Sequence, residues 1–255
     1  MGAIEDLIER MRSMLADLER ADDLRRHFHA TYFRTTVAVK EEIERGGFLD
    51  PVWVERWDVA FADLYLDAME EWDRTGDAPG PWRIAFTAAR DGTPDRPRLP
   101  PLRHVLLGIN AHVNYDLPQA LLAVIGDDEF DDPAVSERRA ADHAKVDDIL
   151  VRRVAAEDVE LQKVEQPGDR TVLDRLMQPF NRAGTKRFLA EARRKVWHNA
   201  RELSSARRGG DTDLARRLGA LEELSRARVA DLVEPRFVIL RLARHGFGVE
   251  LPAVP

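Results

Sequence analysis

The chain has 255 residues, of which 44% are hydrophobic and 33% charged, and it contains no cysteine. This length and composition predict one globular domain over residues 1–255. The absence of cysteine excludes disulfide bonds, thiolate zinc sites and cysteine nucleophiles, so a metal ion would need His, Asp or Glu ligands. The formal net charge of −7 disfavours nucleic acid as a partner.

The first twenty residues mix acidic and basic side chains and contain no unbroken apolar run. This pattern is typical of neither a secretory signal nor a membrane span. We therefore expect a protein without a membrane span and with a cytoplasmic location.

Apolar residues recur at three- and four-residue steps along most of the chain, which predicts an all-α, single-domain bundle of about eight helices. Asp50 and Pro51 supply a helix N-cap followed by a first-turn proline. An acidic helical domain of this kind could also bury one helix face in a homodimer. The expected helices cover two stretches of 1–45 with a break at 21–23, and then 51–73, 81–90, 102–125, 136–164, 171–177, 183–206 and 211–243.

The proline-rich stretch 91–101 cannot continue a helix. Because it leads directly into the segment 102–122, we expect it to lie beside the opening to any site on that segment and to act as a lid.

The segment 102–122 is apolar enough to be buried on most sides, and we expect it at the centre of the bundle, crossed by the helix at 51–73. Polar residues in such a helix need hydrogen-bond partners, a metal or water. Helical geometry predicts two separate polar stripes. One contains His104, Gly108, His112 and Asp116, and the other contains Asn110 and Asn114.

His112 and Asp116 are one helical turn apart, a spacing from which both side chains can reach one divalent ion. With His104 or His143 as further ligands, such a site would hold zinc, iron or manganese. Asn110 and Asn114 join His112 and Asp116 as candidate catalytic residues. The alternative is a hydrogen-bond network that locks buried helices together.

Gly108 lies in the middle of this helix, where glycine costs about 1 kcal/mol relative to alanine. Its presence indicates that another helix or a ligand approaches closely at this position.

Residues 127–131 have the letter pattern DDxxD, with which helical terpene cyclases bind magnesium diphosphate. Gly126 and Pro133 flank the string, however, as expected for an acidic turn. No second magnesium motif follows.

Three functions therefore stay open. The first is a metal-dependent enzyme, such as a hydrolase, that acts on a small-molecule or lipid-like substrate. The second is a non-catalytic module that holds an apolar small molecule in a cavity lined by Trp57, Phe61 and Tyr65, with no cofactor. The third is a terpene-cyclase-like enzyme.

The string Gly108-Ile-Asn-Ala-His-Val-Asn-Tyr-Asp-Leu-Pro118 resembles the motif of an uncharacterised helical family found in actinobacteria. The likeness extends to Tyr32–Thr36, Phe48–Pro51 and Asp58–Ala62, and it covers nearly the whole chain. It implies a helical fold and a central role for the motif, and it brings no known activity.

A more distant likeness is to the zinc-dependent phospholipases C and single-strand nucleases, which use His and Asp at the same spacing to bind catalytic metal. This chain lacks the N-terminal tryptophan ligand of that superfamily and several of its histidines, so the likeness is an analogy.

Overall fold

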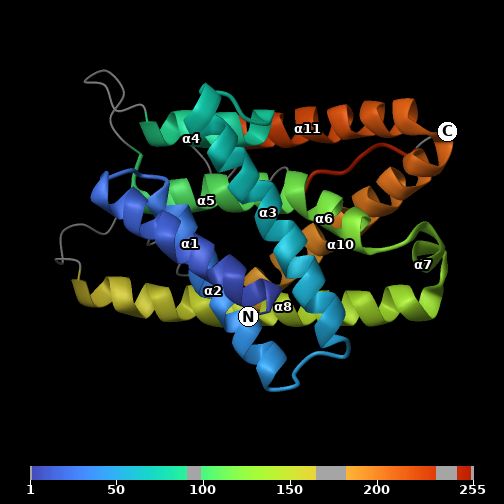
Figure 1. Cartoon of the computed structure of the whole chain (residues 1–255), viewed down its shortest axis with the longest axis horizontal. Helices are drawn as coiled ribbons and strands as arrows, with labels where there is room; N and C mark the ends of the chain where they lie inside the picture. Colours follow the sequence, from blue (N-terminus) through green and yellow to red (C-terminus); the bar gives the residue numbers. More distant parts are fainter. Residues whose placement is uncertain (1, 91–98, 165–181, 234–245, 254–255) are drawn as a thin grey trace.

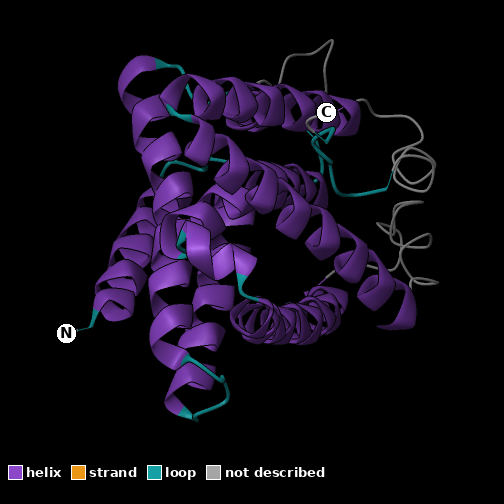
Figure 2. Ribbon diagram, turned by 90° about the vertical axis from the view of Figure 1, so that its right-hand side faces the viewer, coloured by secondary structure: helices purple, strands orange, loops and turns teal. Residues whose placement is uncertain are grey.

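The computed structural model describes residues 2–90, 99–164, 182–233 and 246–253. Within these ranges every regular element is helical and no strand is present, which confirms the predicted all-α class (Figure 2). The helix expected at 171–177, the end of the one expected at 211–243 and most of the loop 91–101 lie outside the described residues. None of the described helices is long and apolar enough to span a membrane.

The helices follow the predicted order with small shifts at their ends (Figure 1). The central segment is divided into two helices by a π-helical turn, η1, and the acidic string forms a short helix rather than a turn. The elements are α1 (Ala3–Arg20), α2 (Arg26–Glu44), α3 (Pro51–Thr75), α4 (Gly80–Arg90), α5 (Pro101–Ala111), η1 (His112–Asp116), α6 (Leu117–Val124), α7 (Asp127–Asp131), α8 (Pro133–Val164), α10 (Arg182–Gly209) and α11 (Asp211–Val233).

Helix α3 begins and ends as its sequence predicts. The Asp50 side chain accepts a hydrogen bond from the backbone N–H of Trp53 at 3.0 Å, and Pro51 occupies the first turn. Gly76 ends the helix with a left-handed φ of 74°, a conformation that favours glycine. These caps fix the register of the helix that carries most of the aromatic residues.

The segment α5–η1–α6 lies at the centre of the bundle, as predicted, and α3 crosses it (Figure 1). Helix α11 packs against α4 and α5, while α10 packs against α6. Leu107, Ala111, Ala120 and Leu121 are completely buried. Polar side chains on this segment therefore lie in the interior of the protein.

The π-helical turn follows from Pro118. Proline has no N–H to donate to the carbonyl of Asn114 one turn earlier, and its ring would collide with that carbonyl in a regular α-helix. The chain instead widens by one residue, and the N–H of Leu117 bonds the carbonyl of His112. Such turns are frequent at functional sites, and this one contains both His112 and Asp116.

Gly108 allows α2 to approach α5, which confirms the close approach predicted from the sequence. A Cβ atom at this position would lie 2.2 Å from Cγ of Phe28. The Phe28 ring cannot easily withdraw, because it also contacts the rings of Tyr65, Trp82 and His112.

We therefore expect Gly108→Ala to lower the free energy of unfolding by about 1–3 kcal/mol, despite the better helix propensity of alanine. The matched control is Gly219→Ala in α11, where a Cβ atom would meet nothing within 4 Å. That substitution should raise the free energy of unfolding by about 0.5–1 kcal/mol. Urea titration of both variants checks this expectation, and equal gains in stability would contradict it.

Candidate functional site

His112 and Asp116 form a hydrogen-bonded pair inside the η1 turn. The distance from Nδ1 of His112 to Oδ2 of Asp116 is 2.8 Å, and both residues are at least 97% buried. The indole Nε1–H of Trp82, on α4, donates to the same carboxylate oxygen at 2.9 Å. Asp116 therefore fixes the orientation of the imidazole, and α4 in turn fixes Asp116.

Five aromatic rings surround the His112 imidazole. Phe61 stacks on it with a centroid distance of 3.5 Å and an interplanar angle of 7°, and Tyr32 contacts it edge to face at 4.5 Å. The rings of Phe28, Tyr65 and Trp82 each lie 5.9 Å away. We call these five rings and His112 the aromatic chamber.

Burial determines the charge of the His112–Asp116 pair. It lowers the pKa of His112 well below its usual value, and it raises the pKa of Asp116 well above its usual value, partly offset by the Trp82 hydrogen bond. Burial therefore favours a pair without net charge. In that state one proton lies between Nδ1 and Oδ2, and Nε2 carries a second proton. Nε2 is buried and has no hydrogen-bond partner among the described residues.

Two buried polar side chains are absent from the site residues predicted from the sequence: Tyr32, which is part of the chamber, and Asp58, which lies near Tyr32. Among the described residues, no hydrogen bond of normal geometry reaches the Tyr32 hydroxyl or Oδ2 of Asp58. Burial raises the pKa of Tyr32 well above its usual value, and the nearby Asp58 and Asp116 carboxyls add to the effect. Burial alone raises the pKa of Asp58 to about 7.

A sequence signal for Asp58 did exist. It lies one turn after Val54 and one turn before Ala62, on the buried face of α3, where a carboxylate has no solvent. Its position among apolar neighbours marks it as a buried polar residue in the same way as those of the central helix.

Asn110 and Asn114 point away from His112, on the separate stripe that helical geometry predicts. Their side-chain amides both donate to the carbonyl of Phe247, at 3.4 and 3.1 Å. They are also hydrogen-bonded to each other at 3.1 Å. These two candidate catalytic residues therefore contact the C-terminal segment and not the His112 side of the turn.

The four proposed metal ligands do not come together. His104 contacts the carbonyl of Leu99 through Nε2 at 3.2 Å, and His143 accepts a hydrogen bond from Trp197 at 3.0 Å. In the described part of the chain, no three His, Asp or Glu side chains form a group that could hold a metal ion. Only His112 and Asp116 are adjacent, and Asp116 occupies Nδ1 of His112.

Acidic side chains of residues 127–131 and the buried His29 also have partners in the structure. Asp127 binds Arg207 at 2.6 Å and Asp131 binds Arg208 at 2.5 Å, both on α10. His29 is completely buried. Its Nε2 donates to the carbonyl of Met11 at 2.8 Å, so its Nδ1 accepts from the Tyr65 hydroxyl at 3.0 Å.

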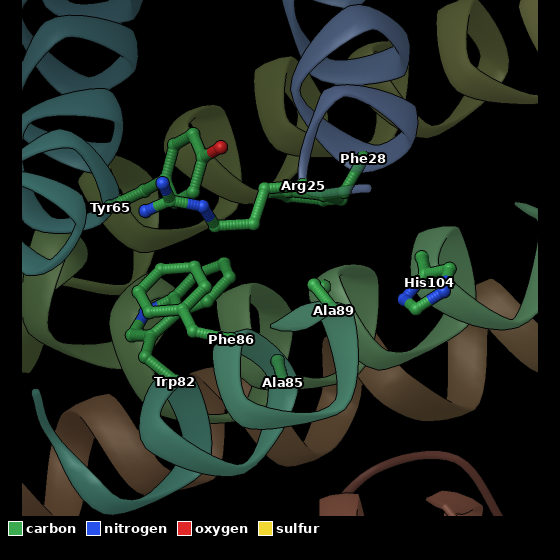
Figure 3. Close-up of a pocket in the computed structure, with 9 residues that line it drawn as sticks. Arg25, Phe28, Tyr65, Trp82, Ala85, Phe86, Ala89 and His104 are labelled. Carbon is green, nitrogen blue, oxygen red and sulfur yellow. The ribbon is translucent and has the colours of Figure 1, made fainter. Parts of the chain in front are cut away.

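A small cavity lies beside the chamber, between α2, α4 and α5 (Figure 3). Its volume is about 20 Å³, enough for about one water molecule. Three of its lining residues, Phe28, Tyr65 and Trp82, also contact the His112 ring. The cavity therefore approaches the chamber through shared aromatic walls, while Arg25 and His104 line it on other sides.

The comparison with protein families gives one match, which covers residues 4–235. The chain belongs to DUF5995, a family of unknown function. No curated protein and no solved structure matches it. This result confirms the resemblance to an uncharacterised helical family. Family membership assigns no activity, so the function of this DUF5995 protein has to be argued from its own side chains.

Proposed function

We propose that this protein binds a small uncharged molecule in the aromatic chamber, and that the molecule carries a hydroxyl or carbonyl oxygen. The observation that carries the proposal is the pair of unpartnered polar atoms on rings in contact, Nε2 of His112 and the hydroxyl of Tyr32. Buried polar groups of native proteins normally have partners, so a ligand oxygen that accepts from both would satisfy them.

The surroundings select for a neutral and partly apolar ligand. The walls are aromatic, and the buried His112–Asp116 pair is favoured without net charge. An ion would lose its hydration here without an opposite charge to replace it. The body of the ligand would pack against the rings, and its oxygen would take the two hydrogen bonds.

The ligand would enter from the cavity between α2, α4 and α5. Since that cavity holds only about one water molecule, entry would require an aromatic side chain in its wall, such as Phe86, to move. This step belongs to the proposal, and it predicts that binding is slow compared with diffusion.

The experiment uses phenol as the probe and toluene, which has nearly the same shape but no oxygen, as its control. Phenol should shift the Nε2 resonance of His112 in a ¹⁵N-histidine spectrum and raise the melting temperature, whereas toluene should do neither or much less. Tyr32→Phe should weaken phenol binding about tenfold, since it removes one hydrogen bond. The matched control is Tyr115→Phe, which removes a tyrosine hydroxyl from the η1 turn outside the chamber. Equal responses to phenol and toluene would refute the proposal.

The metal-dependent hydrolase and the terpene-cyclase-like enzyme stay predictions from the sequence. The described residues offer no set of three metal ligands to support either. Metal analysis of protein purified without a histidine tag tests the former. One equivalent of zinc, iron or manganese that is lost in His112→Ala would favour it over the proposal made here.

A further inference from the structure

The C-terminal residues 246–252 cross the bundle in a conformation without helix or strand. Their described hydrogen bonds to the rest of the chain run between tail backbone and side chains of α5, η1, α10 and α11. The carbonyls of Gly246, Phe247, Gly248 and Val249 each accept from at least one such side chain. The carbonyl of Leu251 likewise accepts from His198, and the carbonyl of Pro252 accepts from Arg217.

Asn114 and Asn199 bind the tail backbone with the same pattern of hydrogen bonds, at positions two residues apart along the tail. Asn114 donates to the carbonyl of Phe247 at 3.1 Å and accepts from the N–H of Val249 at 3.0 Å. Asn199 donates to the carbonyl of Val249 at 3.0 Å and accepts from the N–H of Leu251 at 2.8 Å. The repeat matches the two-residue period of an extended chain.

The tail side chains follow the same period. Phe247, Val249 and Leu251 are buried, with exposed fractions of 5%, 6% and 1%, while Glu250 is exposed. Between them, Gly248 lies close against α10, since a Cβ atom there would be 2.9 Å from Cδ of Lys195 and 3.3 Å from Cα of Ala192. The surface therefore recognises extended backbone, three apolar side chains and one glycine.

We infer that this surface, which we call the asparagine groove, is a peptide-binding site that accepts the C-terminal tail of a second copy of this chain. The tail of the same molecule occupies it in the structure. The hydrogen bonds described above join bundle side chains to the backbone of the tail, so an identical tail from a neighbour could make the same hydrogen bonds.

The segment that precedes the tail is long enough for two molecules to exchange tails. Twelve residues, 234–245, separate the end of α11 from Gly246. A chain of that length reaches up to about 40 Å when extended, enough to pass to an adjacent molecule. Because the molecule's own tail competes at a high effective concentration, exchange should be weak in the native protein and strong when that tail is damaged.

The experiment mixes two damaged full-length variants. Val249→Asp/Leu251→Asp disables the tail and leaves the groove intact, whereas Asn199→Leu damages the groove and leaves the tail intact. The two should pair one to one in analytical ultracentrifugation at micromolar concentration, while each alone stays monomeric. If the double aspartate variant is unfolded by circular dichroism, Gly248→Leu replaces it, because it displaces the tail through a clash with α10.

A synthetic peptide of residues 246–253 provides a second readout. It should bind the tail-damaged variant at least tenfold more tightly than the native chain. The N–H groups of Val249 and Leu251 donate hydrogen bonds to the side-chain oxygens of Asn114 and Asn199. N-methylation of these two amides removes both donors and should abolish binding. N-methylation at Glu250 should have little effect. Failure of a folded tail-damaged variant to bind either the peptide or the complementary variant would overturn the inference, as would equal binding of the two N-methylated peptides.

Discussion

Replacing Asp116 by leucine is expected to lower the free energy of unfolding by about 3–5 kcal/mol. The substitution removes the only described hydrogen-bond acceptor of the Trp82 indole and the only described hydrogen-bond partner of the His112 ring. Both groups are buried, and the aromatic rings packed around them would keep them so. Asp116→Asn should lose less, since its amide oxygen can still accept from Trp82. Guanidinium titration measures both.

A double-mutant cycle then tests whether His112 and Asp116 act as one unit. His112→Phe alone leaves a buried carboxyl with Trp82 as its remaining partner. In Asp116→Leu/His112→Phe neither the carboxyl nor the imidazole is left, so the double variant should lose about 1–3 kcal/mol less than the sum of the single losses. The matched control combines Asp116→Leu with His143→Phe, which should be additive because His143 is bonded to Trp197. Additive losses in the first pair would contradict the shared role.

A chelator separates the two explanations of this coupling. A hydrogen-bonded pair is indifferent to EDTA, whereas a metal site loses the stability that the bound ion supplies. With a chamber of the described geometry we expect the same unfolding curve with and without EDTA. A lower midpoint in EDTA for the native chain, but not for His112→Phe, would instead support the metal site predicted from the sequence.

The fold was predictable because its signals are local. Asp50 with Pro51 at one end of α3 and Gly76 at the other bound a helix that periodicity already indicates. The two polar stripes of the central helix also follow from 100° per residue. What periodicity does not contain is the partner across the bundle: nothing near Asp116 in the sequence specifies Trp82, which lies 34 residues earlier.

Three structural features were not predicted from the sequence, two of them for physical reasons. The π-helical turn depends on Pro118, whose effect on the preceding turn was not considered. The tail was overlooked because the alternation of Phe247, Val249 and Leu251 is too short for a strand of its own. Its order comes from side chains of other helices. Asp58, by contrast, could have been found from its position among apolar neighbours on α3.

Asp58 should make the protein less stable as the pH rises, and Asp58→Asn should remove this dependence. The folded pKa of about 7 lies above the value of about 4 that the unfolded chain has. Between these values the folded state binds more protons than the unfolded state. The free energy of unfolding therefore falls from pH 4 through pH 7, at up to about 1.4 kcal/mol per pH unit, and the Asp58 contribution becomes constant above about pH 8.

The measurement is the difference in unfolding free energy between Asp58→Asn and the native chain at a series of pH values. The difference should grow in favour of the variant by about 3–4 kcal/mol between pH 4 and pH 7. The buried histidines, whose lowered pKa values destabilise the fold below about pH 6.5, are present in both proteins and cancel. Asp67→Asn, at an exposed position of the same helix, is the matched control. If the difference in unfolding free energy between Asp58→Asn and the native chain did not change with pH, the Asp58 carboxylate would be ionised and stabilised by its surroundings in the folded protein at pH 7. Asp58 would then not be a protonated neighbour of the chamber, and Tyr32 would lie beside a charge.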